Sequence, residues 1–345
     1  MIDFPLSSNM LMMPRKLPHS AWLGHIPFAS WLVEVVRPKS IVELGTHNGA
    51  SFLAFCQAVE TQQVSTRVFA VDTWEGDEHA GFYGNEIYAE LRDYQQRHYA
   101  GISEMMRMRF DQALEYFADG SVDVLHVDGL HTYEAVREDF ETWRSKLSPR
   151  AVVLFHDSCV RERGFGVWQY WSEISSQFPS FEFTHTHGLG VLLVGEEQPQ
   201  ALLQLAQAAR DGQFATINQF FDALGRNIKN VEEIERVNQG LTAAHGEIGR
   251  LNAEEARLRA LLEKNSDATE EHYAIVESQL PSLAQGLSLL ERRVIEGMSE
   301  TRQALDHSRE ASVANVVASV IPRLDEQDRK LNLLVRPWWR RALGR

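Results

Sequence analysis

Two short apolar stretches of the chain each end on acidic or titratable side chains. VDVLHVD, residues 122–128, ends on Asp128, and AVVLFHD, residues 151–157, ends on His156 and Asp157. If these stretches form neighbouring parallel strands, about 4.8 Å apart, the three side chains converge beyond the carboxyl ends of the strands, where α/β sheets bind ligands. Like charges that are buried together need a neutralising partner. A divalent cation bound by all three residues is one such partner; carboxylates favour Mg²⁺, and the histidine shifts the preference toward Mn²⁺.

A second histidine follows the first of these strands. His131 lies three residues after Asp128 and is the candidate general base, because the pKa of an imidazole lies near working pH. The alternative is that His131 caps the next helix or hydrogen-bonds the backbone. His126, in mid-strand, is expected to be a satisfied core histidine. Glu134 and Asp139 are expected on the solvent face of the next helix or at its start, where acids complement the helix dipole.

Residues 40–55 (SIVELGTHNGASFLAF) are typical of a strand, a tight glycine turn and the start of a helix, which is how nucleotide-binding α/β folds open. Gly45 and Gly49 allow the turn and the close approach of a ligand. A dinucleotide fingerprint requires glycine at the position of His47, whose side chain would obstruct a pyrophosphate; a nicotinamide oxidoreductase is therefore disfavoured. Asp72 ends the next predicted strand, where an acid can accept hydrogen bonds from both ribose hydroxyls; the alternative is a surface acid that closes a strand.

Strand-like and helix-like patterns alternate up to about residue 195. The predicted strands are residues 40–45, 67–72, 106–110, 122–128, 151–157, 181–186 and 189–195. Several are nearly continuous apolar runs, as expected for strands buried on both faces of a parallel sheet. The alternation predicts a doubly wound, mostly parallel, seven-stranded α/β sheet. Only His187 and Gly188 separate the last two strands, which are therefore expected to pair antiparallel.

Together these motifs resemble the class I S-adenosylmethionine-dependent methyltransferases. VELGTHNGAS, VFAVDTWEGD, LSPRAVVLFHDS and the D-G-x-H-x-Y-x-x-V-x-x-D pattern that begins at Asp128 carry the resemblance, which covers residues 40–195 and is closest to the branch with sugar and macrolide O-methyltransferases. The resemblance implies that Asp72 binds the cofactor's ribose. It implies cofactor contacts from Glu43, Gly45, Thr46, Gly49, Asp72, Thr73, Asp111, Gln112 and Asp128, with Asp111 and Gln112 beside the adenine.

Methyl transfer to a hydroxyl requires the oxygen, the methyl carbon and the sulfur in line, and a route for the hydroxyl proton. His131 and Asp128 are the predicted catalytic residues, and a metal at Asp128, His156 and Asp157 would lower the pKa of the hydroxyl. The alternative is that the positively charged sulfonium, with its substrate, neutralises these acids. The chain departs from the family at Leu130, where many relatives have an acid that serves as base. It departs again at 149–151, where Pro-Arg-Ala replaces the frequent Pro-Gly-Gly.

Two loops are candidates for covering the site. Residues 73–88 are rich in glycine and aromatic residues and are predicted to form a lid over cofactor and acceptor, with Trp74, His79, Phe82 and Tyr83 as candidate contacts. Residues 161–171 (RERGFGVWQYW) are predicted to line an acceptor pocket, because aromatic rings stack well on sugar faces.

The composition changes after residue 227. Heptad a and d positions hold Ile234, Val237, Leu241, Ala244, Ile248, Leu251, Glu255, Leu258 and Leu262, and a second run holds Tyr273, Val276, Leu280, Leu283, Leu287, Leu290 and Val294. These seams predict an oligomerising coiled coil over residues 228–335; the alternative is a helical hairpin that folds back on the first half. Residues 1–199 are then the methyltransferase-like domain, and residues 200–227 form a helical neck or, as the alternative, pad the sheet.

The chain ends in a short basic and aromatic tail, residues 336–345, whose tryptophans and arginines suit an anionic membrane surface; a solvated tail and a partner-binding motif are the alternatives. The net charge of -14 over 345 residues argues against a nucleic-acid partner. No window holds about 18 consecutive apolar residues, so no membrane span is predicted. We expect a cytoplasmic protein, with peripheral contact at the inner membrane as an option.

The predicted function is O-methylation of a sugar or glycan acceptor in bacterial surface-polysaccharide assembly. The predicted cofactors are S-adenosylmethionine and Mg²⁺ or Mn²⁺, and the predicted partners are further copies of the chain and glycan-assembly proteins. One alternative is a methyltransferase for a small natural product. Another is a non-catalytic coiled-coil assembly subunit, against which the acids at 72, 128 and 157 argue, because an inactive site has no need for them.

Overall fold

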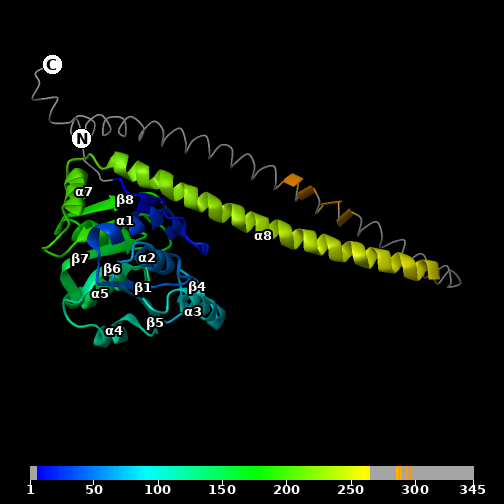
Figure 1. Cartoon of the computed structure of the whole chain (residues 1–345), viewed down its shortest axis with the longest axis horizontal. Helices are drawn as coiled ribbons and strands as arrows, with labels where there is room; N and C mark the ends of the chain where they lie inside the picture. The colour runs from blue at the N-terminus through cyan, green and yellow to red at the C-terminus, as the bar shows by residue number, and fades with distance from the viewer. Residues whose placement is uncertain (1–5, 265–284, 287, 290–291, 294, 297–345) are drawn as a thin grey trace, which may run out of the picture. The chain divides into compact units, whose positions relative to one another are not determined.

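The computed structural model describes residues 6–264, 285–286, 288–289, 292–293 and 295–296. Its chain divides into two units, Met1–Lys229 and Asn230–Arg345. The first unit holds the sheet and its covering helices (Figure 1). The residues of the candidate site belong to the same unit.

A seven-stranded sheet forms the centre of the first unit. Its strands are β1 (Ser40–Leu44), β2 (Arg67–Asp72), β5 (Ser103–Arg107), β6 (Val122–Val127), β7 (Leu147–His156), β8 (Ser180–Phe183) and β9 (Leu189–Leu193). Their order is β5-β2-β1-β6-β7-β9-β8. The first five pair parallel, whereas β9 is antiparallel to both β7 and β8. The predicted mostly parallel α/β sheet and its antiparallel last pair are confirmed.

The third main strand lies three residues earlier than predicted. β5 covers Ser103–Arg107 rather than 106–110, because its pairing with β2 sets Ser103 opposite Val68 and Arg107 opposite Asp72. The chain then turns, and Phe110 already begins α4 (Phe110–Ala113). This earlier turn decides where the residues after β5 point.

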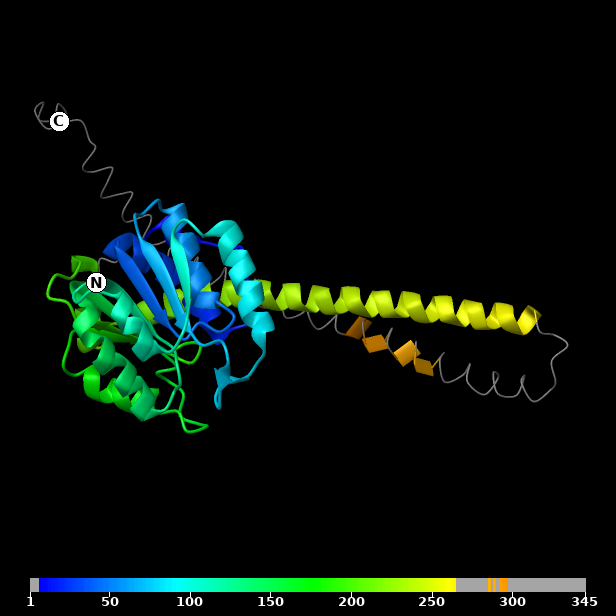
Figure 2. The ribbon, with the colours of Figure 1, turned by 90° about the horizontal axis from the view of Figure 1, so that it is seen from below.

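Helices cover both faces of the sheet (Figures 1 and 2). Side chains alternate between the faces along each strand: Ile41 and Val124 belong to one core cluster, and Val42 and Leu125 to the other. The first cluster packs under α1 (Ile26–Val36), α2 (Ala50–Thr61), α3 (Asn85–His98), α7 (Gln200–Arg210) and the start of α8 (Ala215–Lys264). The second packs under α4, α5 (Tyr133–Trp143) and α6 (Val167–Ile174).

Short elements complete the first unit. They are the 3-10 helices η1 (Ser8–Leu11), η2 (Ala21–His25), η3 (Leu114–Tyr116) and η4 (Arg144–Lys146), and a small hairpin formed by β3 (Gly76–Asp77) and β4 (Gly81–Phe82).

Residues 200–227 pad the sheet instead of forming a separate neck. Leu202 and Leu205 of α7 and Phe221 of α8 are almost fully buried in the same core cluster as α1. The apolar faces of these helices therefore belong to the core of the first unit.

In the second unit, α8 continues to Lys264. The heptad residues from Ile234 to Leu258 are half-buried, whereas every other residue from 235 to 257 is exposed. The helix therefore carries the predicted seam, and the coiled coil itself stays a prediction. The second heptad run and the tail at 336–345 lie outside the described residues. Among the described residues, no helix is both long and apolar enough to cross a membrane.

Candidate functional site

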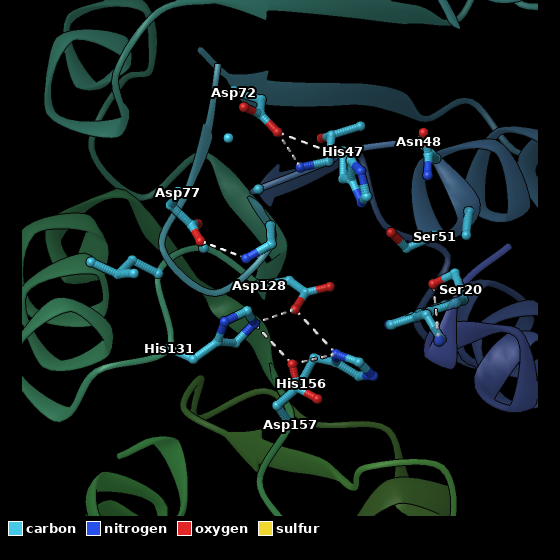
Figure 3. Close-up of a pocket in the computed structure, with 18 of the residues that line it drawn as sticks. Ser20, His47, Asn48, Ser51, Asp72, Asp77, Asp128, His131, His156 and Asp157 are labelled. Carbon is cyan, nitrogen blue, oxygen red and sulfur yellow. Dashed lines mark hydrogen bonds and ion pairs between the residues drawn. The ribbon is translucent and has the colours of Figure 1, made fainter. Parts of the chain in front are cut away.

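A cavity of about 390 Å³ lies at the carboxyl ends of β1, β2, β6 and β7 (Figure 3). Its volume is within the usual range for small-molecule sites. Of the predicted site residues, the cavity is lined by Gly45, Thr46, Asp72, Thr73, Asp128, His131, His156 and Asp157. The predicted Glu43, Gly49, Asp111 and Gln112 lie outside its lining. We call the side formed by Gly45, Thr46, His47 and Asp72 the glycine-turn end, and the side formed by Asp128, His131, His156 and Asp157 the carboxylate end.

At the glycine-turn end, Asp72 accepts hydrogen bonds from three backbone N–H groups. Its Oδ2 accepts from Thr46 N at 2.8 Å and from His47 N at 3.0 Å, and its Oδ1 accepts from Trp74 N at 2.7 Å. Asp72 thus ties the turn after β1 to the turn after β2. A carboxylate has about four acceptor positions, so capacity is left for a ribose hydroxyl, and ribose binding stays a prediction.

Gly45 is required by the close approach of two strand ends. Its φ is +88°, and a Cβ there would lie 2.1 Å from the carbonyl oxygen of Asp128. The N–H of Asp128 donates to the carbonyl of Leu44 at 2.8 Å. Only glycine allows the end of β1 to lie this close to the end of β6, and the approach brings Asp128 to the cavity.

Glu43 does not line the cavity, and its predicted cofactor contact stays a prediction. Its fully buried Oε2 lies 2.9 Å from Nδ1 of His126, and the indole Nε1 of Trp22 donates to Nε2 of His126 at 3.1 Å. Because an indole N–H can only donate, the proton of His126 is on Nδ1 and points at Glu43. His126 is the satisfied core histidine that the sequence predicts, and this chain of bonds supports Trp22, which lines the cavity.

Asp111 and Gln112 also lie away from the cavity. Both are exposed: Asp111 pairs with the guanidinium of Arg109 at 2.9 Å, and Oε1 of Gln112 accepts from the N–H of Arg109 at 3.1 Å. The preceding Arg109 and Phe110 line the cavity instead. The early end of β5 is the reason, because α4 has already begun and turns residues 111 and 112 outward.

At the carboxylate end, two acids and two imidazoles point toward one another (Figure 3). Nε2 of His131 lies 2.8 Å from Oδ2 of Asp157 and 3.5 Å from Oδ1 of Asp128. Nδ1 of His156 lies 3.1 Å from Oδ1 of Asp128 and 3.3 Å from Oδ2 of Asp157. Each imidazole therefore faces both carboxylates, as the predicted convergence of the two strand ends requires.

The charges of this cluster stabilise one another against burial. Burial alone would raise the pKa of Asp128, but the charge of His156 and the hydrogen bonds from both histidines lower it to about 2. Burial alone would lower the pKa of His131, but its bonds to Asp128 and Asp157 raise it to about 9. The pKa of His156 is raised, and that of Asp157 lowered, by the same partners against the same effect of burial. At neutral pH in this arrangement His131 keeps its proton, so its role as a base stays a prediction.

Three residues of the carboxylate end fit a divalent cation. Asp128, His131 and Asp157 each offer a ligand atom, and these atoms lie within 4.8 Å of one another. Two carboxylate oxygens and an imidazole nitrogen suit Mn²⁺ or Mg²⁺. Nδ1 of the predicted ligand His156 also lies within 3.3 Å of both acids, so its part in a metal site stays a prediction. His156 is the last residue of β7, and its ring packs in the interior against His25 and His126.

The structure adds cavity residues that the sequence analysis missed. They are His19, Ser20 and Trp22 before and within η2, Asn48 and Ser51 beside the glycine turn, and His187 before β9. Ser20 had a sequence signal, since it caps η2 by accepting from Trp22 N. His187 had none, because nothing in the sequence connects a turn histidine with an acid 30 residues earlier, at Asp157.

The four candidate contact residues of the predicted lid loop lie in different surroundings. Tyr83 lines the cavity and stacks on His47, with ring centroids 4.8 Å apart. Trp74 is buried, and Phe82 is 79% exposed. His79 stacks on Phe165 at 4.6 Å, and Phe165 in turn stacks on His131 at 4.5 Å. The loop at 161–166 therefore contacts the carboxylate end through Phe165.

The two acids predicted on the solvent face of α5 differ. Glu134 is exposed in the first turn of α5, as expected. The side chain of Asp139 is half-buried and lies against the turn after β6. If Gly129 carried a Cβ, that atom would lie 3.3 Å from Oδ2 of Asp139. Burial and the neighbouring Glu138 raise the pKa of Asp139 to about 7.

Residues 42–158 match the model of a family described as a methyltransferase domain. This segment, which contains the residues that define both ends of the cavity, is thus similar in sequence to methyltransferase domains. A protein of Sinorhizobium fredii (strain NBRC 101917 / NGR234), named "Uncharacterized protein y4gI", is 55% identical over 194 residues, which are 56% of this chain and 21% of that protein. The chain thus spans about a fifth of the length of this relative.

Two solved structures show a fainter likeness. CalS11, a calicheamicin methyltransferase, is 14% identical with a TM-score of 0.43 over 51% of this chain and 81% of its own. The O-methyltransferase TomG of Streptomyces achromogenes, in complex with S-adenosylmethionine, is 16% identical with a TM-score of 0.39 over 52% of this chain and 83% of its own. At these scores the two structures give no information on the acceptor of this chain.

Proposed function

We propose that this chain is an S-adenosylmethionine-dependent O-methyltransferase that acts on a sugar hydroxyl. The observation that carries the proposal is a single cavity within the methyltransferase domain, with Asp72 and its glycine turn at one end and Asp128 and Asp157 at the other. The first end suits a nucleoside, and the second suits a hydroxyl that must lose a proton.

S-adenosylmethionine fits the residues of the glycine-turn end and supplies an activated methyl group there. Asp72 and Thr73 would bind its ribose, with Gly45 and Thr46 beside its methionine part. The hydroxyl of Thr46 supports this fit, because it is buried and finds no hydrogen-bond partner among the described residues. The stacked Tyr83 and His47 would exclude water from this end.

The carboxylate end would orient the acceptor hydroxyl and promote its deprotonation. A divalent cation held by Asp128, His131 and Asp157 would lower the pKa of the hydroxyl. Without a cation, His131 would have to give up a proton that both carboxylates hold in place before it could act as base. Metal assistance is therefore the version of the proposal that the charges of this site favour.

We further propose that the acceptor belongs to bacterial surface-glycan assembly. The support is the sequence resemblance to the sugar O-methyltransferase branch, together with the charged hydrogen-bonding groups of the carboxylate end, which match the hydroxyls of a sugar. Glycan-assembly proteins are the proposed partners.

Calorimetry and a methylation assay test the proposal. S-adenosylhomocysteine should bind and NAD should not. With S-adenosylmethionine and a panel of UDP-glucose, GDP-mannose and TDP-rhamnose, methyl transfer should need Mg²⁺ or Mn²⁺ and stop in EDTA. Activity that is unchanged in EDTA would remove the metal but leave the methyltransferase. Failure of S-adenosylhomocysteine to bind would overturn the enzymatic proposal.

The seam of α8 is proposed to pair with further copies of the chain. Its heptad positions are mostly apolar and many of the positions between them are charged, as in coiled coils. Ile248→Lys should shift the mass of the full chain, measured by light scattering, to that of a single chain. Ala243→Lys, at an exposed position of the same helix, should not. A wild-type mass of one chain would contradict this pairing.

A further inference from the structure

The turn between β8 and β9 adds an imidazole to the carboxylate end. Nδ1 of His187 lies 2.9 Å from Oδ1 of Asp157, the oxygen that His131 and His156 leave free. The side chain of His187 is 57% exposed, whereas that of His131 is 13% exposed. His187 is thus the imidazole of this cluster that an incoming molecule meets first.

The strand order places His187 far from the glycine turn. β9 lies beyond β7, whereas Asp72 ends β2 on the opposite side of β1 and β6. His187 lines the same cavity from this far side. It therefore faces the space left for an acceptor and not the space proposed for the cofactor.

The hydrogen bond to Asp157 leaves one ring nitrogen of His187 available. A carboxylate oxygen can only accept, so Nδ1 of His187 carries the proton of this bond. In the neutral ring Nε2 is then an acceptor. A sugar hydroxyl that enters the cavity can donate to Nε2, and Asp157 fixes the ring in the orientation that permits this bond.

The turn that carries His187 is held in a strained conformation. Thr186, His187 and Gly188 have φ values of +45°, +68° and +92°, and a left-handed conformation is sterically unfavourable at residues other than glycine. The carbonyls of Gly188 and His187 accept from Asp157 N at 3.1 Å and Cys159 N at 2.8 Å. The strain is therefore maintained at the place where the turn meets Asp157.

The first turns of α8 hold the other side of this loop. Oδ1 of Asn218 accepts from Thr184 N at 2.9 Å, and its Nδ2 donates to Oγ1 of Thr184 at 3.1 Å. Nδ1 of His185 lies 3.4 Å from the same Oδ1. A helix outside residues 42–158 thus fixes the turn that completes the site, although Asn218 itself lies outside the cavity lining.

We propose that His187 binds the acceptor hydroxyl and that Asn218 is the residue that positions it. This inference rests on the proposed methyltransferase function, and it makes the acceptor side of the site depend on α8. His187→Ala removes the contact, and Asn218→Ala removes the support. Asn218→Asp keeps the acceptor for Thr184 N, and its second oxygen can accept from the Thr184 hydroxyl in a bond of reversed direction, so it should rescue. Asn227→Ala, at an exposed position of the same helix, is the matched control.

The four variants are compared in the full chain. With the sugar nucleotide of the panel that is methylated fastest, His187→Ala should raise the KM of the acceptor about tenfold and Asn218→Ala by about half that factor. The Kd of S-adenosylhomocysteine should stay within about twofold of the wild-type value, because its end of the cavity is untouched. An unchanged acceptor KM in His187→Ala, or a cofactor Kd that rises in parallel in Asn218→Ala, would overturn the proposal.

A second measurement does not depend on activity. In chain labelled with ¹⁵N at histidine, the ring signal that disappears in His187→Ala identifies His187, and it should show the proton on Nδ1. Asn218→Ala should abolish this tautomer preference, and Asn218→Asp should restore it. If no sugar is methylated but this pattern holds, the proposed function has failed while the positioning by Asn218 stands; a wild-type pattern in Asn218→Ala sinks the positioning itself.

Discussion

The two ends of the cavity satisfy their acids in different ways. At the glycine-turn end, the carboxylate of Asp72 accepts hydrogen bonds from three backbone N–H groups in the turns after β1 and β2. At the carboxylate end, Asp128 and Asp157 are bound by side-chain imidazoles, which can lose a proton or rotate.

The difference corresponds to what each end is proposed to do. A cofactor site gains from a preformed surface, because binding then loses little conformational freedom. An acceptor site must exchange partners when a cation or hydroxyl arrives, and imidazoles can release the carboxylates that they hold. The glycine-turn end is therefore built from backbone, and the carboxylate end from groups that can be displaced.

Removal of one carboxylate should have the largest effect. Asp157→Asn leaves His131, His156 and His187 without the acid that they share, so kcat should fall by about 10³-fold. The Kd of S-adenosylhomocysteine, measured by calorimetry, should stay within about twofold of the wild-type value. A large rise of that Kd would show that the two ends are not independent and would contradict the comparison.

Gly45→Ala should damage the backbone framework that joins the ends. The new Cβ would meet the carbonyl of Asp128 at 2.1 Å, and the free energy of unfolding in urea should fall by about 3 kcal/mol. Gly120→Ala is the control, since its φ is also positive, +70°, but a Cβ there has no described atom within 4 Å. It should cost about 1 kcal/mol. Equal losses in the two variants would mean that backbone conformation alone, and not the strand contact, requires Gly45.

Asp139 is an acid whose pKa is raised mainly by burial, in contrast to Asp128, whose pKa is lowered by its histidine partners. Its pKa is about 7 in the folded chain and about 3.9 in the unfolded chain, so the unfolded state releases the proton first and stability falls as pH rises from about 4 to about 7. Asp139→Asn should therefore raise the free energy of unfolding by about 2 kcal/mol at pH 8. At pH 4 it should give no gain, and a gain that does not depend on pH would contradict the raised pKa.

Tyr83→Leu should have the smallest effect. It removes the stack on His47, and an aromatic pair contributes about 1 kcal/mol, so the Kd of S-adenosylhomocysteine should rise about fivefold. The acceptor KM should not change, because Tyr83 contacts the glycine-turn end. Tyr83→Phe, which keeps the ring, should bind like the wild type; if it weakens binding as much as Tyr83→Leu, the hydroxyl and not the stack is responsible.

Sequence reasoning succeeded where a local pattern has one structural outcome. The ends of parallel strands share an edge of the sheet, so Asp128 and Asp157 had to converge once their strands were neighbours. It did not identify the partner of a side chain that could bind to several others. Glu43 is bound by His126, which lies far along the chain. Asp111 is bound by Arg109, because α4 already begins at Phe110.

The sequence also does not distinguish His131 from His156 as a candidate cation ligand. Both lie at or just after the end of a strand and are equivalent in sequence terms. Only the packed structure shows that the ring of His156 lies against His25 in the interior, while His131 shares a ligand geometry with the two acids.

The sequence by itself determined the strand–helix alternation, the glycine turn and the acids at the strand ends, since these follow from periodicity and backbone freedom within a few residues. The tertiary structure alone decided that Trp22, His187 and Asn218 belong to the site or its support. Their partners lie between 30 and 104 residues away along the chain. Such contacts form only when the core packs, and no short pattern in the sequence records them.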